Sequence, residues 1–504
     1  MRVLQVSAEI FPLLKTGGLA DIAGAMPAAL AEVGCDVRVL LPGFPSVVAA
    51  LDDAAIVCNL VAPWGETFTL RKGTLRGMAP RGLRAYVIDA PALYDRPGNP
   101  YENAQRQPYA DNHRRFALLG WVAAQLGQGV DAAWQPQVVH GHDWHAGLAP
   151  AYLHFARPPL REPVGTVFTV HNLAYQGVFA ADLFADLGLP PLANRIDGIE
   201  FYGKISFMKA GLYYADRITT VSPTYAHEIQ TPEQGCGLDG LLRARGGVLS
   251  GILNAVDETV WNPAADTLIP ANFDADDRAG KARCKSALQR ELGLAVERRA
   301  PLFSVVSRLT EQKGLQLVVA AVDEIIAHGG QLVVLGSGDA ALEQALRVQA
   351  LKHPQSVAVH LGYDEALAHR IFAASDVTLV PSRFEPCGLT QMYGLKYGSL
   401  PLVRRVGGLA DTVVDSTLED LAEETANGFV FDDFTAEAMI RALRRAFVLY
   451  ARPKDWTAVS GRAMRQTYGW NVSAQKYLAL YQQIAGPSGS ATGATSAGIA
   501  ALPS

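Results

Sequence analysis

The chain has 504 residues, 49% of them hydrophobic, and its 44 basic and 49 acidic residues give a formal net charge of −5. This length predicts two large domains with well-filled cores. The moderate charge argues against a nucleic-acid or anionic-membrane surface, and no apolar run approaches the roughly 20 residues that span a bilayer. The N-terminus also lacks the pattern of a signal peptide.

The five cysteines are widely spaced and form no Cys-x-x-Cys pair. An odd number without such pairs argues against a disulfide framework or a zinc site. We therefore expect a soluble, cytoplasmic protein in a reducing compartment.

The N-terminal half alternates strands with helices. Residues 3–7 form an apolar strand, residues 15–21 a loop, residues 22–33 a helix and residues 37–41 the next strand. This order implies a parallel sheet. After a β-rich insertion at residues 64–82, the series continues with strands at 84–88, 138–139, 167–170, 218–221 and 248–253 and helices at 113–126 and 204–214.

Residues 254–277 are polar and are predicted to form a linker. The predicted second domain, residues 254–465, includes this linker. The alternation then resumes with strands at 303–306, 332–335, 357–361, 377–380 and 400–403 and helices at 436–450 and 472–484. Two such series predict an α/β fold of two facing, doubly wound Rossmann-like domains with a cleft between them. The first domain covers residues 1–253, and the tail at 486–504 has a disordered composition.

The first strand-to-helix loop reads Lys15-Thr16-Gly17-Gly18-Leu19-Ala20-Asp21. Lys15 can neutralise phosphate charge, and the two glycines let the backbone approach an anion closely. The order of residues differs from that of a Walker A loop. A glycine-rich turn without a ligand is the alternative for the glycines alone.

Residues 376–413 place further glycines where loops turn into helices. Glu385 lies in a loop after a strand, and Gly388 precedes a helix at residues 389–397. Helix N-termini suit phosphate, and ligands in such folds bind beyond the carboxyl ends of the strands. Glu385 therefore either contacts sugar hydroxyls there or caps the helix. Cys387 is either a small packed residue or a reactive thiol.

Arg308 and Lys313 lie in one strand-to-helix loop at residues 307–314. Both can face a single polyanion from there. Fixed cations stabilise the negative charge that develops on a phosphate leaving group more than they stabilise the intact reactant. The alternative is that both are solvated surface charges.

Residues 140–145 read His-Gly-His-Asp-Trp-His and invite a metal-site interpretation. Asp143 lies one position too early for the His-x-His-x-Asp-His zinc pattern, and no second cluster accompanies it, so we predict no metal. His171 and Asn172 follow another strand end, where a lone histidine is usually structural.

Residues 334–341 carry a Gly-x-Gly-x-x-Ala turn between a strand and a helix, which is the best support for an NAD-dependent oxidoreductase. The turn is not the first of its domain, and no acid is clearly placed for the ribose. Packing and proximity to a donor are the preferred interpretation. The Asp-Ala-Asp at residues 274–276 lies in the linker and is interpreted as solvated charge.

The string KTGGLAD and the 376–413 stretch together resemble the bacterial glycogen synthases and plant starch synthases, a family of retaining two-Rossmann glycosyltransferases with the GT-B fold. The resemblance runs from Met1 to about Ile484. It implies transfer of glucose from ADP-glucose to the non-reducing end of an α-1,4-glucan such as glycogen, with retention of configuration, release of ADP and no metal or other cofactor. It also implies that the last helix, at residues 466–485, packs back on the first domain.

The resemblance implies catalytic roles for Glu385, His171, Arg308, Lys313 and Asp143, and donor contacts for Lys15, Gly17, Gly18, Asp21, Asn172, Tyr363, Cys387, Gly388, Leu389 and Thr390. In this family the acid at Glu385 contacts the donor sugar, the histidine at His171 lies beside the glucose, and the aromatic at Tyr363 stacks on adenine. Tyr94 and Tyr175 match positions in the sugar or acceptor cleft, although both can equally be packing residues.

Two rival functions remain open at this level. A nucleotide-sugar epimerase or hydrolase can use the same fold, but it needs no KTGG loop. A silent glucan-binding protein has little reason to keep Lys15, Arg308, Lys313 and Glu385 together. The residues themselves do not distinguish adenine from uracil in the donor, and they leave the oligomeric state open.

Overall fold

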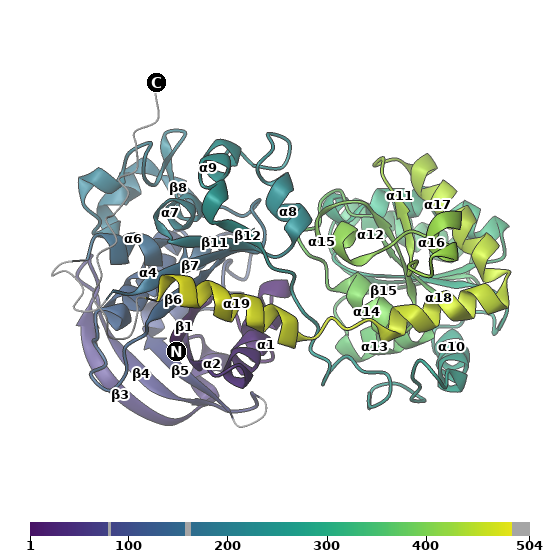
Figure 1. Ribbon diagram of the computed structural model, residues 1–504, viewed down its shortest axis with the longest axis horizontal. Helices are drawn as coiled ribbons and strands as arrows, with labels where there is room; N and C mark the ends of the chain where they lie inside the picture. The colour runs from purple at the N-terminus through teal and green to yellow at the C-terminus, as the bar shows by residue number, and fades with distance from the viewer. Residues whose placement is uncertain (79–81, 157–162, 486–504) are drawn as a thin grey trace.

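The computed structural model describes residues 1–78, 82–156 and 163–485, which form two α/β lobes side by side (Figure 1). In this part of the chain the N-terminal lobe holds a nine-stranded sheet in the order β12-β11-β7-β6-β1-β2-β5-β4-β3. Its strands are β1 (Arg2–Val6), β2 (Asp36–Pro42), β3 (Leu51–Val61), β4 (Thr67–Leu75), β5 (Leu83–Asp89), β6 (Val138–His142), β7 (Gly165–Val170), β11 (Arg217–Thr220) and β12 (Leu249–Gly251). All neighbours pair in parallel except β3 with β4 and β4 with β5.

The C-terminal lobe holds a parallel sheet in the order β15-β14-β13-β16-β17-β18. Its strands are β13 (Leu302–Val306), β14 (Gln331–Gly336), β15 (Val357–Leu361), β16 (Val377–Val380), β17 (Leu400–Arg404) and β18 (Phe429–Phe431). A small antiparallel sheet in the first lobe consists of β8 (Val178–Ala180), β10 (Lys204–Ser206) and β9 (Glu200–Phe201).

Helices flank both large sheets (Figure 1). Those of the first lobe are α1 (Gly18–Glu32), α2 (Pro45–Ala49), α3 (Pro91–Tyr94), α4 (Asn112–Gly127), α5 (Asp143–Ala146), α6 (Leu148–His154), α7 (Phe207–Tyr214), α8 (Pro223–Glu228) and α9 (Asp239–Ala244). The later ones are α10 (Ala279–Glu291), α11 (Leu315–Ala327), α12 (Ala340–Lys352), α13 (Glu365–Ala374), α14 (Thr390–Lys396), α15 (Gly407–Thr412), α16 (Leu418–Ala422), α17 (Ala436–Tyr450), α18 (Pro453–Arg465) and α19 (Trp470–Ile484). Short 3-10 turns are η1 (Ala181–Leu187), η2 (Pro191–Ala193), η3 (Gly246–Val248) and η4 (Glu311–Lys313).

The central strands are mostly apolar because helices cover both of their faces. Every residue of β7, β14 and β16 is buried. The helices are instead apolar on one side. In α17, for example, Met439, Ala442, Leu443 and Ala446 are buried at helical spacing, and the Thr435 side chain caps the N-terminus by accepting a hydrogen bond from the Ala438 N–H.

The last helix, α19, crosses from the second lobe and lies along the first, beside α1 (Figure 1). Tyr477 and Tyr481 on this helix belong to an apolar cluster with Val3 of β1 and Val138 of β6. A Cβ at Gly165 would lie 3.0 Å from the Ile484 backbone oxygen, so the end of α19 packs directly against the start of β7.

Two short helices, α8 of the first lobe and α15 of the second, connect the lobes, because a carboxylate from each helix accepts hydrogen bonds at the start of the other. Asp411 of α15 accepts hydrogen bonds from the Ser222 hydroxyl at 2.5 Å and from the Thr224 N–H at 3.1 Å, at the start of α8. In return, Glu228 of α8 accepts one from the Gly407 N–H at 2.9 Å, at the start of α15. Negative groups are favourable at both positions because helix N-termini carry partial positive charge.

Several predicted element boundaries are wrong. Helix α1 begins at Gly18 rather than at residue 22, because the extended backbone of Gly17 already provides the N-cap. Residues 204–206 form β10, and the following helix starts only after Ser206, whose hydroxyl caps it. The insertion begins earlier than expected, with β3, and α18 was not predicted. The tail at 486–504, predicted to be disordered, lies outside the described residues.

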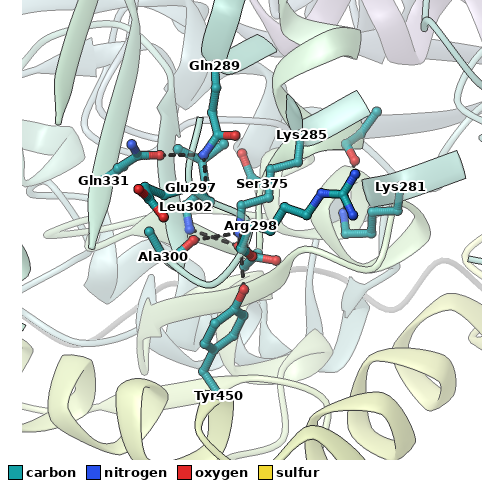
Figure 2. Close-up of polar contacts among 12 residues, drawn as sticks. Lys281, Lys285, Gln289, Glu297, Arg298, Ala300, Leu302, Gln331, Ser375 and Tyr450 are labelled. Carbon is teal, nitrogen blue, oxygen red and sulfur yellow. Dashed lines mark hydrogen bonds and ion pairs between the residues drawn. The ribbon is translucent and has the colours of Figure 1, made fainter. Parts of the chain in front are cut away.

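A buried ion pair between Lys285 and Asp376 holds α10 to the C-terminal sheet. Figure 2 shows Lys285 with two of its other partners, Ala300 and Tyr450. The Lys285 ammonium donates to Asp376 Oδ2 and to the Ala300 carbonyl, both at 2.6 Å, and to the Tyr450 hydroxyl at 3.1 Å. Asp376 Oδ2 also accepts the Leu302 N–H at 2.8 Å. The pair therefore connects α10 and α17 with the starts of β13 and β16.

Replacing Lys285 with alanine should destabilise the protein strongly. The Asp376 carboxylate would stay buried without its cation, which costs about 3 kcal/mol and lowers the melting temperature by roughly 6–12 °C. Thermal unfolding followed by calorimetry measures the change. Lys352→Ala is the matched control, because Lys352 forms a 2.7 Å ion pair with Asp323 on the exposed surface and should shift the midpoint little. Equal shifts for both variants would contradict the assignment.

Candidate active site

Lys313 and Glu385 form an ion pair between two loops at the carboxyl ends of adjacent strands. The Lys313 ammonium lies 2.5 Å from Glu385 Oε2, which also accepts a hydrogen bond from the Ser382 hydroxyl at 2.9 Å. The loops touch because Gly314, with a φ of +73°, packs directly on the Pro381 carbonyl. Glu385 does not cap α14, whose N-cap is Leu389 without a side-chain hydrogen bond. The capping alternative for Glu385 is therefore wrong.

The backbone around Glu385 is held by the start of α15. A Cβ at Gly407 would overlap the Glu385 carbonyl oxygen, and one at Gly408 would overlap Cys387. The Gly408 N–H donates to the Glu385 carbonyl at 3.2 Å. The two glycines thus allow the start of α15 to pack closely on the loop of Glu385. Because α15 also contacts α8, this packing connects the Glu385 loop with the first lobe.

Cys387, Gly388, Leu389 and Thr390 make the turn into α14. Gly388 has a φ of +72°, and the Gln391 amide donates to the carbonyls of Cys387 and Gly388. The Cys387 side chain lies in an apolar cluster shared by both lobes, and burial raises the pKa of its thiol strongly. The structure therefore favours packing over a reactive thiolate for Cys387.

Asp143, His171 and Asn172 lie together on the first lobe. Asp143 Oδ1 accepts hydrogen bonds from the His171 N–H at 2.7 Å and the Asn172 N–H at 3.4 Å. Asp143 has a φ of +56°, an unusual conformation for a non-glycine residue that is frequent at functional sites. Burial raises the pKa of Asp143 to about 7, although the two N–H groups oppose this shift.

The KTGG loop is held by Glu9, a residue that the sequence did not single out. Glu9 Oε2 accepts hydrogen bonds from the Thr16 N–H at 2.6 Å and the Gly17 N–H at 3.2 Å, and its other oxygen accepts one from the Tyr101 hydroxyl. The Lys15 ammonium pairs with Asp21 at 2.9 Å. The backbone N–H groups of the loop are therefore bonded to Glu9, and the Lys15 ammonium, which was expected to contact phosphate, is bonded to Asp21.

Two contacts bring the predicted residues of one lobe to those of the other. Arg308 Nη1 lies 3.4 Å from the Tyr175 hydroxyl, and the Lys15 ammonium lies 5.9 Å from the centre of the Tyr363 ring. The Tyr363 side chain is 72% exposed, so the part of its ring that Lys15 does not cover can stack on a planar ligand. The predicted residues of the two domains therefore meet at the face between the lobes.

Tyr94 lies elsewhere, in the packed interior of the first lobe. It is 1% exposed, and its hydroxyl donates to the Arg115 carbonyl at 2.7 Å. Its ring packs edge-on against Phe44. Of the two roles that the sequence left open for Tyr94, the structure favours packing over direct contact with a sugar.

The Gly-x-Gly-x-x-Ala turn serves the packing of neighbouring loops. A Cβ at Gly336 would overlap the Ser307 carbonyl, and one at Gly338 would overlap the Leu309 carbonyl. Asp339 caps α12 by accepting hydrogen bonds from two N–H groups of its first turn. The turn thus supports the loop that carries Arg308.

Within residues 1–78, 82–156 and 163–485, no group of three or more His, Cys, Asp or Glu side chains is arranged to hold a metal ion. His140 and His142 are instead hydrogen-bonded to protein groups. Asp274, in the linker, accepts the N–H groups of Asp276 and Asp277 in a tight turn. Over the same described residues, no helix combines the length and the apolar character that a membrane span requires.

Comparison with known families identifies a two-domain glycosyltransferase. Residues 2–244 match the family described as the starch synthase catalytic domain, and residues 294–458 match the family described as glycosyl transferases group 1. The catalytic domain of starch synthase IV from Arabidopsis thaliana, solved with ADP and acarbose bound, superposes with a TM-score of 0.86 at 32% identity, over 96% of this chain and 99% of that one. A sucrose-phosphate synthase from Thermosynechococcus elongatus shares the fold, with a TM-score of 0.58 at 16% identity, over 96% and 98%.

Relatives named glycogen synthase cover nearly the whole chain. The one from Variovorax paradoxus is 65% identical over 96% of this chain and 99% of its own length. The one from Leptothrix cholodnii is 59% identical over 96% of this chain and 100% of its own. The chain therefore belongs to the bacterial glycogen synthase family.

Asp143 should give the stability of the protein a characteristic pH dependence. The folded state retains a proton up to about pH 7, whereas an ordinary aspartate loses it near 3.8. The contribution of Asp143 to stability is therefore fully present below about pH 4 and is lost as the pH rises to about 7. Asp143→Asn keeps an oxygen acceptor but does not titrate. The melting temperature of the variant minus that of wild type should therefore increase as the pH is raised from 5 to 7.5. A difference that does not vary with pH would contradict this.

Proposed function

We propose that this protein transfers glucose from ADP-glucose to the non-reducing end of an α-1,4-glucan, with retention of configuration and release of ADP. The observation that carries the proposal is the Lys313–Glu385 pair, which sets a cation and an acid side by side where two strands end. Family membership at up to 65% identity supports the donor and acceptor. The proposal requires no metal ion.

The diphosphate of the donor would lie against Lys313, Arg308 and Lys15. Lys313 and Arg308 come from one loop of the second lobe, and Lys15 would reach the diphosphate from the first lobe, where its ammonium lies 5.9 Å from the Tyr363 ring. The N-terminal turn of α14, at Gly388, Leu389 and Thr390, would add backbone donors and the positive end of a helix. These groups stabilise the charge that develops on ADP as the glycosidic bond breaks.

The glucose ring would lie between Glu385 and the first lobe. Glu385 accepts hydrogen bonds from sugar hydroxyls, while the Lys313 ammonium, which has three donors, keeps its contact with Glu385 Oε2 and also bonds the phosphates. Asp143 holds the backbone of His171 and Asn172, so that both side chains are placed beside the ring. Attack on the same face, with the departing phosphate accepting the proton of the acceptor hydroxyl, accounts for retention. Double displacement is the alternative.

Tyr363 supplies the adenine contact in this proposal, and Gly17, Gly18 and Asp21 shape the loop of Lys15. We also propose that residues 1–253 form the acceptor domain, residues 254–465 the donor domain and residues 466–485 the helix that returns to the first domain. The contact of α19 with α1 supports the last assignment. The five free cysteines fit a reducing, cytoplasmic location.

Lys313→Ala should lower kcat by about 10²-fold or more, the usual effect of removing one charge-stabilising donor. The fold should tolerate the change, because the Lys313 side chain is partly exposed and Glu385 keeps the Ser382 hydroxyl as a partner. Steady-state rates and the melting temperature together separate the two effects. Unchanged turnover in a folded variant would remove Lys313 from the mechanism.

The proposed function is tested by offering ADP-glucose and UDP-glucose in parallel to the enzyme with glycogen, without added metal. Label in the polymer and free nucleotide are both measured in a short assay, and Glu385→Ala, whose turnover should be strongly reduced, serves as the control. We expect labelling from ADP-glucose that is strongly reduced in the control. Nucleotide release without labelling would indicate a hydrolase, and no consumption of either donor would indicate a binding protein.

A further inference from the structure

A buried chain of hydrogen bonds connects the returning helix α19 with His171. Its centre is Gln5, which is 3% exposed and is the one polar residue among the four buried residues of strand β1. Gln5 Oε1 lies 2.5 Å from His142 Nε2, and His142 Nδ1 lies 3.0 Å from His171 Nε2. On the other side, the Gln5 amide nitrogen lies 3.1 Å from the hydroxyl of Tyr481 on α19.

The position of Gln5 explains why a polar side chain there must be fully bonded. Strand β1 lies in the middle of the N-terminal sheet, between β2 and β6. An amide in this environment is costly unless its oxygen and its nitrogen both find partners. Gln5 satisfies this requirement with side chains only, two histidines and a tyrosine, and all three come from other elements.

The chemistry of the amide sets the direction of the chain. An amide oxygen only accepts hydrogen bonds, so His142 Nε2 carries the hydrogen and His142 Nδ1 is bare. His171 Nε2 must then donate to His142 Nδ1. This leaves His171 Nδ1 as an acceptor, since burial lowers the pKa of His171 to about 3 and keeps the ring neutral.

The second arm of the network is consistent with this direction. The Gln5 amide nitrogen donates to the Tyr481 hydroxyl, which in turn donates to His140 Nδ1 at 2.8 Å. His140 Nε2 then carries a hydrogen and donates to the Thr169 hydroxyl at 2.6 Å. Each polar atom of this arm has a partner of the opposite kind.

We propose that Gln5 is a positioning residue for glucosyl transfer, which holds His171 as its Nε2–H tautomer so that Nδ1 accepts a hydrogen bond from a hydroxyl of the donor glucose. This inference rests on the proposed function, because His171 is assigned there to the sugar. It also gives α19 a role beyond packing. Through Tyr481, the helix that returns from the second lobe steadies the amide that orients His171.

The direct test reads the histidine tautomers by two-bond ¹⁵N–¹H correlation in the full-length enzyme, labelled at histidine and free of substrate. A His171→Asn sample assigns the His171 signals. We expect wild-type His171 to show a bare Nδ1 and a protonated Nε2. In Gln5→Met, which keeps the volume but removes both polar atoms, the His171 signals should shift toward a mixture of tautomers. A protonated Nδ1 in wild type, or unchanged signals in Gln5→Met, would overturn the proposal.

Kinetics supply the second readout. In Gln5→Met, kcat for transfer from ADP-glucose should fall about tenfold, while the KM for ADP-glucose changes less than twofold. Tyr481→Phe, a milder change on α19, should lower kcat several-fold and keeps the test available if Gln5→Met does not fold. Tyr477→Phe is the control, because Tyr477 is buried on the same helix and its hydroxyl bonds neither Gln5 nor a histidine. It lies near Thr169 and Thr219, at the far end of the second arm, so kcat should stay within about twofold of wild type. Equal losses in both tyrosine variants would indicate a merely structural effect and overturn the proposal.

The tautomer measurement needs no substrate. If the wild-type enzyme transfers no glucose but His171 shows the expected tautomer that Gln5→Met disturbs, the proposed function fails and the control of His171 by Gln5 stands. If glucose is transferred but His171 shows the opposite tautomer, the proposed function stands and the proposed control of His171 by Gln5 fails.

Discussion

The contact between Lys313 and Glu385, within the second lobe, is the interaction on which the proposed site depends. Each residue lies in a loop after a parallel strand, β13 or β16, and those strands are neighbours in the sheet. Because parallel strands end at the same edge, their loops deliver a cation and an acid to one point. There the cation suits the departing diphosphate and the acid suits the sugar that it leaves. The remaining structure keeps these two groups in place.

Close contacts of the backbone at Gly407 connect the Glu385 loop of the second lobe with the first lobe. Gly407 allows α15 to press on the carbonyl of Glu385, and the N–H of the same glycine is held by Glu228 of the first lobe. The helix α19 leaves the second lobe and contacts Gln5, which is connected to His171 through His142. Both lobes therefore contribute to the position of groups on each side of the proposed glucose site, and a shift of one lobe against the other would disturb both sides together.

The sequence predicted the fold well because buried parallel strands are continuous apolar runs and are visible without context. Helix α17 was predicted with its observed bounds, Ala436–Tyr450. The loops of Lys313 and Glu385 were found for the same reason, although the ion pair across 72 residues was not. Glu9 and Gln5 escaped notice because a single polar residue in or after an apolar strand has no spacing that marks its partners. For Tyr94 the sequence left two roles open, since a local motif does not reveal whether a ring faces a ligand or the core.

The central claim, that Lys313 and Glu385 act as one unit in transfer, is tested most directly by a double-mutant cycle on kcat with ADP-glucose and glycogen. Lys313→Ala, Glu385→Ala and the double variant are compared with wild type, with the melting temperature of each confirming the fold. If the pair acts as a unit, the double variant should be no more than a few-fold slower than the slower single variant. Losses that multiply across the two positions would show that Lys313 and Glu385 act independently and would contradict the account.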